Sequence, residues 1–455
     1  MNPKKKSQRF LIMIGLAFAM LILNGCGKNP MSAEQPKDNA SQTVISKKDL
    51  TDKLKNKDVV ALDVRTEEAY NGWKLDGVAR GGHIQGAVDF PIAWTKNAKD
   101  EQIKSILKAK GVTEDKTVVV YDNKGEQSAQ AADTLKKLGY NKILIYKGGM
   151  AEWAADASLP VDGLKNYSSL VYPAWINQLI KGEKSEAAPA KDYKIFEVSW
   201  GEPKDYKLGH IPGAIHLDTN TIESEPLWNR VSDKALEAML VKNGVTQDTT
   251  VILYGVDSTA ATRAASIIMY SGVKDVRLLN GGFDAWKNAG LAVETKENQP
   301  VPVKDFGVKV PAHPEYILDM PQAKEVLADK DSKLVSIRSW DEQIGKTSGY
   351  SYIKPKGRIK GDVWGHAGSD ANHMEEYRNI DNTMRNANEI AAFWKASGIT
   401  SDQKRVSFYC GTGWRASEAF FDAYLMGWKN ISVYDGGWFE WSMDPSNPVA
   451  TGEPQ

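Results

Sequence analysis

The stretch YDGGWFEW, residues 434–441, belongs to a pattern that the chain repeats. Two related stretches occur earlier, YKGGMAEW at 146–153 and LNGGFDAW at 279–286. All three read Gly-Gly-x-x-x-Trp, and their first glycines are Gly148, Gly281 and Gly436. Glycine pairs suit a tight turn with a close backbone approach, and we expect each tryptophan to pack in a core.

A second landmark precedes each glycine pair by 26 residues, at Asp122, Gly255 and Cys410. Each of these residues follows an apolar run that ends in tyrosine: TVVVY at 117–121, TVILY at 250–254 and RVSFY at 405–409. One offset found three times predicts three copies of a single structural unit.

Within each copy, strand-like and helix-like segments alternate. A residue pattern of helical period follows the second landmark, and another apolar run follows that helix. A further apolar run lies upstream: VVALDV at 59–64, KIFEV at 194–198 and KLVSI at 333–337. This alternation predicts an α/β fold in which each copy is a parallel sheet with helices on both faces.

Length and charge agree with this organisation. A chain of 455 residues suggests about three domains. We place them at residues 45–166, 167–300 and 301–455. Lys and Arg number 58, as do Asp and Glu, so the formal net charge is zero and a nucleic-acid partner is not expected.

The first residues differ from the rest in composition. A basic segment, MNPKKKSQRF, precedes the apolar LIMIGLAFAMLIL, which predicts an export signal over residues 1–26. Leu23-Asn24-Gly25-Cys26 resembles the bacterial lipobox, which implies lipidation of Cys26, a flexible tether over 27–44 and a membrane-anchored place in the bacterial cell envelope. A plain signal peptide or an uncleaved anchor is the alternative.

Cys410 is the only other cysteine. If Cys26 carries lipid, Cys410 has no intrachain disulfide partner and is either buried and inert or used in chemistry. It stands at the carboxyl end of a predicted parallel strand, where α/β folds bind ligands. Gly411 and Gly413 let successive N–H groups turn inward, and the helix that begins near Ala416 adds its positive end.

This loop therefore favours an anion and a thiolate at Cys410. Arg415 adds a permanent charge with several donors for a substrate oxyanion. The corresponding residues in the earlier copies are Asp122 with Gln127 and Gly255 with Ala260. These residues supply no thiol, and the acid at Asp122 would repel an anion, so we expect the first two domains to be inactive scaffolds.

The repeat resembles the rhodanese-type sulfurtransferase domain. Two copies carry its Gly-His-Ile turn, in GGHIQGA around His83 and LGHIPGA around His210, whereas the third has Arg358 at that position. The first copy keeps the family's Asp-x-Arg strand end as Asp63-Val64-Arg65. The order of the copies is similar to that of three-domain thiosulfate sulfurtransferases whose working cysteine lies in the last domain.

The resemblance implies that thiosulfate gives its outer sulfur to Cys410 and that a thiol, a cyanide-like molecule or a protein then accepts it. No cofactor or metal is implied. The expected substrate-binding residues are Gly411, Thr412, Gly413, Trp414, Arg415 and Arg338.

Some assignments stay open in the sequence. Arg338 either reaches the mouth of the third domain or forms a surface salt bridge, and Trp414 either lines the pocket or anchors its helix. The segment from Lys346 to Met384 is either a lid over Cys410 or interdomain packing.

The histidines receive structural assignments instead of catalytic or metal-binding ones. We expect His83 and His210 to stabilise turns, because neither copy has a nucleophile for a base to serve. We expect His366 and His373 to lie in a solvated loop.

Two other functions share features with this loop. Cysteine phosphatases and arsenate reductases normally place five residues between cysteine and arginine, but here there are four, Gly411 to Trp414. A persulfide carrier or docking protein of the envelope with little turnover is the second alternative, which the two domains without a nucleophile favour.

Overall fold

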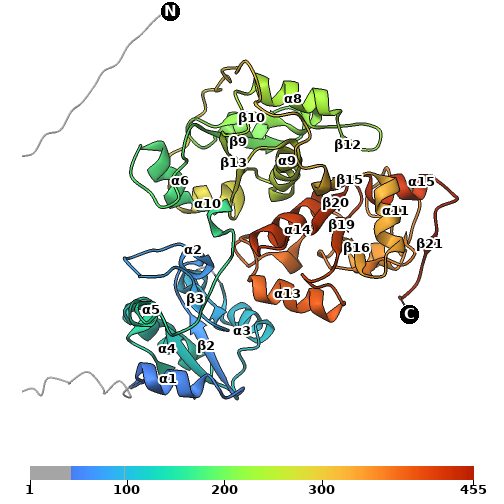
Figure 1. Cartoon of the computed structure of the whole chain (residues 1–455). Helices are drawn as coiled ribbons and strands as arrows, with labels where there is room; N and C mark the ends of the chain where they lie inside the picture. Colours follow the sequence, from blue (N-terminus) through green and yellow to red (C-terminus); the bar gives the residue numbers. More distant parts are fainter. Residues whose placement is uncertain (1–41, 97, 455) are drawn as a thin grey trace, which may run out of the picture. The chain divides into compact units, whose positions relative to one another are not determined.

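The computed structural model describes residues 42–454 except residue 97 (Figure 1). The signal over 1–26, Cys26 and residues 27–41 of the tether lie outside the described residues. Within 42–454, no helix is both long enough and apolar enough to cross a membrane.

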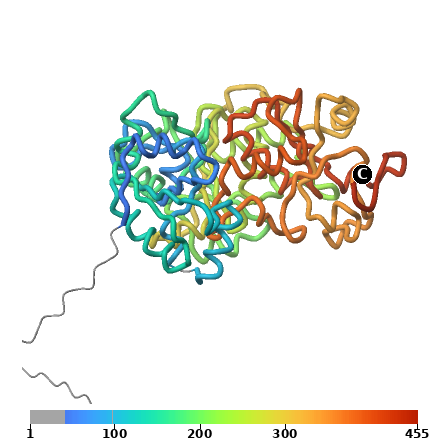
Figure 2. Tube along the Cα trace, turned by 90° about the horizontal axis from the view of Figure 1, so that it is seen from below, coloured from blue at the N-terminus to red at the C-terminus, as the bar shows by residue number. Residues whose placement is uncertain are grey.

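Three five-stranded parallel sheets confirm the predicted repeat and the α/β class. Their strand orders are β1-β6-β5-β2-β4, β8-β14-β13-β9-β10 and β15-β20-β19-β16-β18. In chain order each sheet therefore has the same topology, with the strand before the second landmark at its centre. Figure 2 shows the three units as successive stretches of colour along the chain.

The first unit alternates strands and helices as the sequence predicts, beginning with the two-residue strand β1. Its elements are β1 Thr43–Val44, α1 Lys47–Lys53, β2 Val59–Asp63, α2 Glu67–Asn71, β3 His83–Ile84, β4 Val88–Asp89, α3 Asp100–Ala109, β5 Thr117–Tyr121, α4 Glu126–Lys137, β6 Ile143–Ile145, α5 Gly149–Ala155 and β7 Val161–Asp162. The tether was expected to reach residue 44, but Thr43 and Val44 pair with β6 and belong to the sheet.

The second unit has the same order with an added short hairpin, β11–β12. Its elements are β8 Leu170–Val171, α6 Pro173–Ile180, β9 Tyr193–Ser199, α7 Lys204–Leu208, β10 Ile215–Asp218, β11 Glu223–Ser224, β12 Asn229–Arg230, α8 Asp233–Lys242, β13 Thr250–Tyr254, α9 Ser258–Ser271, β14 Asp275–Leu279 and α10 Gly282–Asn288. Residues 301–312 were assigned to the third domain, yet Val303 N–H donates to Val241 and Phe306 accepts from Gln247. This segment therefore packs on the second unit.

The third unit carries Cys410. Its elements are β15 Ile317–Leu318, α11 Met320–Ala328, β16 Ser332–Ser336, α12 Trp340–Gln343, β17 Arg358–Ile359, β18 Val363–Trp364, α13 Ala387–Ala396, β19 Arg405–Tyr409, α14 Trp414–Leu425, β20 Ile431–Tyr434, α15 Gly437–Met443 and β21 Val449–Ala450. Helices α11 and α15 cover one face of the sheet, and α13 and α14 cover the other (Figure 1).

The glycine-tryptophan motif has the same role in every unit. Trp153, Trp286 and Trp441 are at most 2% exposed, which confirms that they belong to cores. The indole N–H of each donates to a backbone carbonyl six or seven residues ahead. Burial of such a large ring, with its one polar atom satisfied, anchors the helix that follows each glycine pair.

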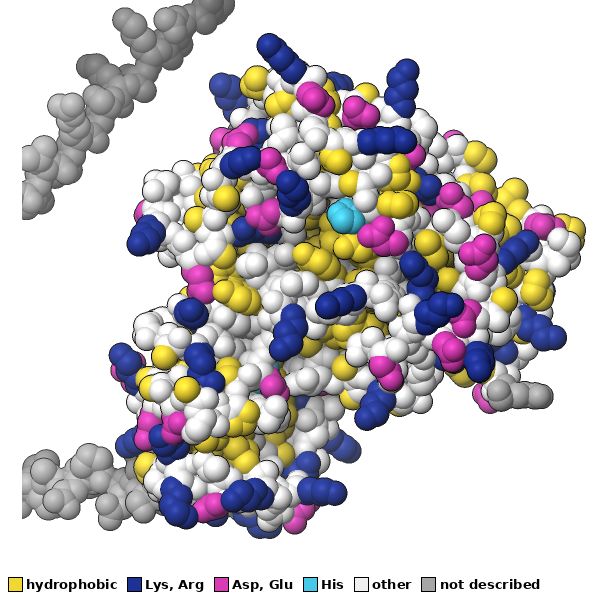
Figure 3. Space-filling view, viewed as in Figure 1, with side chains coloured by type: hydrophobic (Ala, Val, Ile, Leu, Met, Phe, Trp, Pro, Cys, Tyr) yellow, Lys and Arg dark blue, Asp and Glu magenta, His cyan; other side chains and the backbone are white. Residues whose placement is uncertain are grey.

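Charge is dispersed over the surface. Figure 3 shows Lys and Arg side chains interspersed with Asp and Glu over the visible face. This distribution agrees with the zero formal net charge and does not single out a basic stripe on that face.

Candidate active site

Cys410 directly follows β19 and has four residues between it and Arg415, near the start of α14. Its Sγ accepts a hydrogen bond from the Gly413 N–H at 3.2 Å. Gly413 caps α14 with φ +99°, a left-handed conformation that glycine adopts without strain. The predicted curled loop at the positive end of a helix is therefore present, and one inward amide contacts the sulfur.

The segment that begins with the glycine pair at 436–437 holds this loop through backbone hydrogen bonds. Trp438 N–H donates to the Cys410 carbonyl at 2.7 Å, and Phe439 N–H donates to the Gly411 carbonyl at 3.1 Å. A Cβ on Gly437 would lie 2.6 Å from the Cys410 carbonyl oxygen, so only glycine permits this approach. The close backbone approach expected from the double glycine is confirmed.

The thiol is fully buried, with 0% exposure. The ring of Tyr350 covers the loop so closely that a Cβ on Gly411 would collide with it. Tyr352 stacks on Tyr350 with ring centroids 5.4 Å apart. Burial raises the pKa of Tyr352 to about 12 and also raises that of Tyr350, so both phenols remain protonated and can donate hydrogen bonds.

The segment from Lys346 to Met384 thus covers the loop, but it also packs between domains. Asn379 and Thr383 both donate to the buried carboxylate of Glu67 in the first unit. Its amino-terminal part lies over Cys410, and its carboxyl-terminal part joins the third unit to the first.

Arg415 does not present a free guanidinium. It is 1% exposed and forms a two-bonded ion pair with Glu342, at 2.9 and 3.0 Å. Burial by itself would raise the pKa of Glu342, but the adjacent Arg415 and Arg338 outweigh it and hold that pKa at about 2. The charge that we expected to hold a substrate oxyanion is therefore already compensated by a carboxylate.

Arg338 is also buried, at 0% exposure, so it makes no surface salt bridge. It donates to the Gly357 carbonyl at 2.7 Å and to Glu342 at 3.3 Å, and it lies over the Trp438 ring. Arg338 is not among the residues that line the cavity next to the Cys410 loop, which is described below. Its contacts instead hold Glu342 in place for Arg415.

A cavity of about 500 Å³ opens beside the loop, between the second and third units. From the loop, Thr412, Trp414 and Arg415 line it. Five aromatic rings surround the cavity, those of Trp200, Trp228, Tyr350, Tyr352 and Trp414. Three acids accompany them, Glu223, Glu225 and Asp257.

Trp414 fulfils both of its expected roles, because it lines this cavity and also anchors its helix. Its indole N–H donates to Glu223 of the second unit at 2.8 Å. The sequence interpretation missed the whole contribution of the second unit. One signal was present in the sequence: Trp200 directly follows β9, at the same carboxyl edge where α/β sheets hold ligands.

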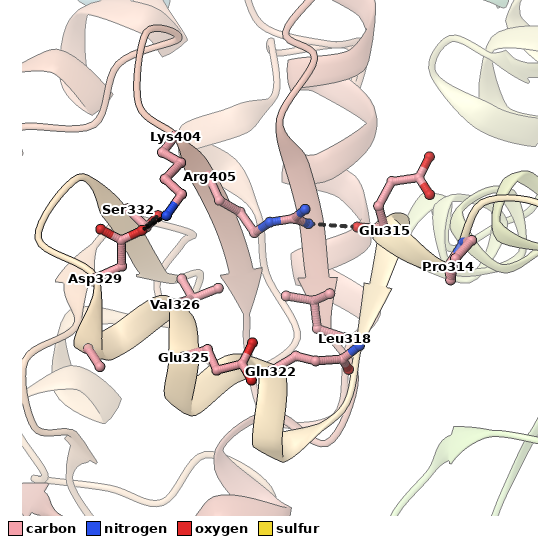
Figure 4. Close-up of a pocket in the computed structure, with 11 residues that line it drawn as sticks. Pro314, Glu315, Leu318, Gln322, Glu325, Val326, Asp329, Ser332, Lys404 and Arg405 are labelled. Atoms are coloured by element: carbon pink, nitrogen blue, oxygen red, sulfur yellow. Dashed lines mark hydrogen bonds and ion pairs between the residues drawn. The ribbon is translucent and has the colours of Figure 1, made fainter.

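A larger cavity, of about 710 Å³, lies at the other end of β19 (Figure 4). Arg405 begins β19 there and donates to the Glu315 carbonyl, while Lys404 pairs with Asp329 at 2.7 Å. Because it adjoins the amino-terminal ends of the strands, this cavity is separated from Cys410 by the length of β19.

The equivalent loop of the first unit is occupied by its own side chain. The Asp122 carboxylate accepts hydrogen bonds from the N–H groups of Lys124, Gly125, Gln127 and Ser128. In the second unit, Gly255 stands at that position and Asp257 caps α9 by accepting from the Thr259 N–H at 2.8 Å. Among the three loops, only that of the third unit begins with a thiol.

His83 and His210 stabilise turns in the first and second units, as expected. His83 bonds the Tyr70 carbonyl through Nδ1 at 2.8 Å, and His210 bonds the Tyr206 carbonyl in the same way at 2.8 Å. Each imidazole stacks on the ring of the same tyrosine. In the third unit Arg358 forms the equivalent tie, donating to the Gln343 carbonyl.

His366 and His373 lie in different surroundings. His373 is exposed and bonds Asp370 at 2.7 Å, in agreement with a solvated loop. His366 differs from that expectation, because it is half-buried and stacks on Trp364 with centroids 3.9 Å apart. In the described part of the chain, no three His, Cys, Asp or Glu side chains cluster as metal ligands would.

Comparison with known proteins places the chain among proteins that handle sulfur. The family described as "Rhodanese-like domain" matches residues 46–156, 177–289 and 319–444. The thiosulfate sulfurtransferase YnjE of Escherichia coli strain K12 is 51% identical over 406 residues, which cover 88% of this chain and 91% of that protein. The sulfur carrier protein TtuD of Thermus thermophilus is 31% identical over 267 residues, covering 54% and 87%.

Solved structures of EanB are similar over their whole length. The wild-type protein is 41% identical with a TM-score of 0.88, and the match covers 92% of this chain and 100% of EanB. A variant structure, with the same identity and TM-score and covering 91% and 100%, contains ergothioneine covalently linked with a persulfide cysteine. Other EanB structures contain hercynine.

Proposed function

The chain belongs to the rhodanese-like family, and from this premise we propose that it is a thiosulfate sulfurtransferase that works through a Cys410 persulfide. The observation that carries the proposal is the hydrogen bond from Gly413 N–H to Cys410 Sγ, at the amino-terminal end of α14. A donor and a helix N-terminus at one sulfur favour its anionic form.

The reaction proceeds in two displacements. The Cys410 thiolate attacks the outer sulfur of thiosulfate, a new S–S bond forms, and sulfite leaves with the electron pair of the old S–S bond. A nucleophilic atom of the acceptor, such as a thiolate sulfur or a carbon, then bonds to the outer sulfur of the persulfide, and Cys410 departs as a thiolate with the electron pair of the broken S–S bond. The loop amide stabilises the negative charge that Cys410 carries before and after the transfer.

Arg415 supports this chemistry indirectly. Because its charge is paired with Glu342, it orders the loop and the covering Tyr350, whose ring lies 5.6 Å from the guanidinium. Access to Sγ requires Tyr350 to move, since the thiol is 0% exposed. The segment from Lys346 thereby gates the nucleophile in this proposal.

A second acceptor class is favoured by the cavity. Five aromatic rings, with Glu225 and Asp257, create a site that suits an organic cation better than an anion, because ring faces and carboxylates both attract positive charge. EanB, whose structures contain hercynine and ergothioneine, offers a parallel of small organic ligands beside a persulfide cysteine. The acceptor on this basis is a small organic cation and thiosulfate remains the donor.

Export and anchoring belong to the same proposal. The basic and apolar segments over residues 1–26, followed by Cys26, support a lipid-anchored protein of the bacterial envelope. Metabolic labelling with a fatty acid tests this, and Cys26→Ser should abolish the label. A labelled serine variant would contradict the anchor.

Intact-mass measurement after incubation with thiosulfate tests the central step. One added sulfur atom on the peptide that contains Cys410, absent in Cys410→Ser, is the expected result. Turnover is then measured with cyanide, with a dithiol and with a trimethylammonium-bearing imidazole in turn. A persulfide that no acceptor discharges repeatedly would favour the carrier function, and no added sulfur at all would overturn the proposal.

A further inference from the structure

Helix α9 of the second unit packs against α14 of the third, and the two lie side by side in Figure 1. Arg263 of α9 is 0% exposed at this junction. Its Nε donates to Glu223 at 3.0 Å, and its Nη2 pairs with Asp435 at 2.7 Å. A buried arginine thus bridges a carboxylate of its own unit and one of the third unit.

The same guanidinium lies against the Cys410 loop. A Cβ on Gly413 would come within 2.8 Å of Arg263 Nη1, so only a glycine fits between the loop backbone and the arginine. In the described chain, no oxygen accepts a hydrogen bond from this Nη1. Glu223, which Arg263 holds, also accepts from the indole of Trp414. Arg263 therefore reaches two consecutive loop residues, one directly and one through Glu223.

Asp435 connects Arg263 to the segment that supports the loop. It immediately precedes the Gly436–Gly437 pair, after which Trp438 N–H donates to the Cys410 carbonyl. Arg230, also from the second unit, donates its backbone N–H to Asp435 at 2.8 Å. One buried charge network consequently holds both segments that flank the nucleophile.

We propose that Arg263 is a positioning residue for sulfur transfer: it fixes the Gly413 peptide so that its N–H faces Cys410 Sγ. This role rests on the persulfide chemistry of the proposed function. Within the third unit, the Arg415 guanidinium contacts Glu342 of another segment, whereas the Arg263 guanidinium of the second unit lies against the backbone of Gly413. The second unit, which lacks a nucleophile of its own, is thereby a working part of the site.

The test compares two buried arginines of the second unit in the full-length protein. Arg263→Met removes the contact with the loop. Arg277→Met is the matched control, because Arg277 is 5% exposed and pairs with Asp275 within its own unit. Two quantities are measured on the peptide that contains Cys410: the pH profile of its alkylation by iodoacetamide and the rate of persulfide formation from thiosulfate.

Arg263→Met should displace the alkylation profile toward higher pH and slow persulfide formation about 10²-fold, the order expected when a positioned group is misaligned by a mutation outside the reacting atoms. Arg263→Lys should restore part of the rate, because it keeps the charge but not the planar fork. Arg277→Met should change neither quantity.

A folded Arg263→Met protein with the wild-type profile and rate would overturn the positioning role. If that variant does not fold, Asp435→Asn is measured in the same way, and an unchanged profile and rate in that variant would overturn the role as well. Failure of the wild-type protein to take sulfur from thiosulfate would instead contradict the proposed function, and the alkylation profile would still report on Arg263.

Discussion

The loops that begin at Asp122 and Cys410 have one architecture and two chemistries. Each follows the central strand of its sheet and precedes a helix, and each is supported by a glycine pair 26 residues ahead. In the first unit the amides converge on the Asp122 carboxylate, which accepts four N–H groups. In the third unit an amide faces a sulfur atom.

The two loops share the strand-loop-helix backbone and its inward N–H groups, and they differ in the first residue, which is a carboxylate in one and a thiol in the other. The sequence led us to expect that Asp122 would repel an anion. The structure adds that the Asp122 side chain itself takes up the inward N–H groups of the loop. The loop of the first unit is a self-occupied version of the third-unit loop, with its donors satisfied internally.

The largest expected effect comes from the nucleophile itself. Cys410→Ser should lower sulfur uptake from thiosulfate by on the order of 10³-fold or more while the protein stays folded, because a hydroxyl cannot form a persulfide. Mass spectrometry of the loop peptide and thermal unfolding measure the two properties. Undiminished sulfur uptake in this variant would mean that another group of the protein takes the sulfur from thiosulfate. The thiol would then not distinguish the third-unit loop from the first-unit loop in function.

The second effect concerns the ion pair that the first loop lacks. Glu342→Gln leaves two buried guanidiniums without their carboxylate and should lower the free energy of unfolding by roughly 3–5 kcal/mol, as measured by urea denaturation. Asp329→Asn, which removes a solvent-screened pair with Lys404, should have a much smaller effect. An equal loss of unfolding free energy in the two variants would mean that burial does not make the Glu342 ion pair more important for stability than the Asp329 pair.

At acid pH, the free energy of unfolding of Glu342→Gln should differ less from that of the wild type than it does at neutral pH. The folded-state pKa of Glu342, about 2, lies below its ordinary value of 4.5. Its charge therefore contributes stability that is present above pH 4.5 and is lost as the pH falls through about 2. Denaturation at neutral pH and near pH 2 checks this, and a gap that widens in acid would contradict the assignment.

The third effect tests the shared support of the loops. Gly437→Ala and Gly149→Ala both place a Cβ against the carbonyls of their loop, at positions with φ near +55°. Each should cost at least about 1 kcal/mol of folding stability. Only Gly437→Ala should also slow persulfide formation, because only its loop carries the thiol. Slower transfer in Gly149→Ala would show that the first unit influences the chemistry.

The smallest effect concerns the occupied cradle. Asp122→Asn should destabilise the protein by about 1 kcal/mol, the size of a lost helix-capping carboxylate. Persulfide formation at Cys410 should remain at the wild-type rate. A marked loss of sulfur transfer would instead assign the first unit a part in catalysis.

The sequence by itself determined the repeat, the α/β class and the placement of Cys410 at the carboxyl end of a strand. These features depend on local sequence. Hydrophobic periodicity indicates which residues form each helix or strand, and the equal spacing between the two landmarks of each copy indicates that the same elements recur. The buried tryptophans, the glycine approach to the loop and the turn-stabilising histidines were predictable for the same reason.

Only the tertiary structure decided which polar and charged side chains contact one another. Glu342 and Arg415 are 73 residues apart in the chain, and Glu223 and Trp414 are 191 apart. The residues next to each of these side chains do not indicate which distant residue it will contact. Such pairs depend on how loops and whole units pack, which hydrophobic spacing does not encode. The compensated Arg415, the aromatic and acidic cavity and the reach of Arg263 into the neighbouring loop follow from that packing alone.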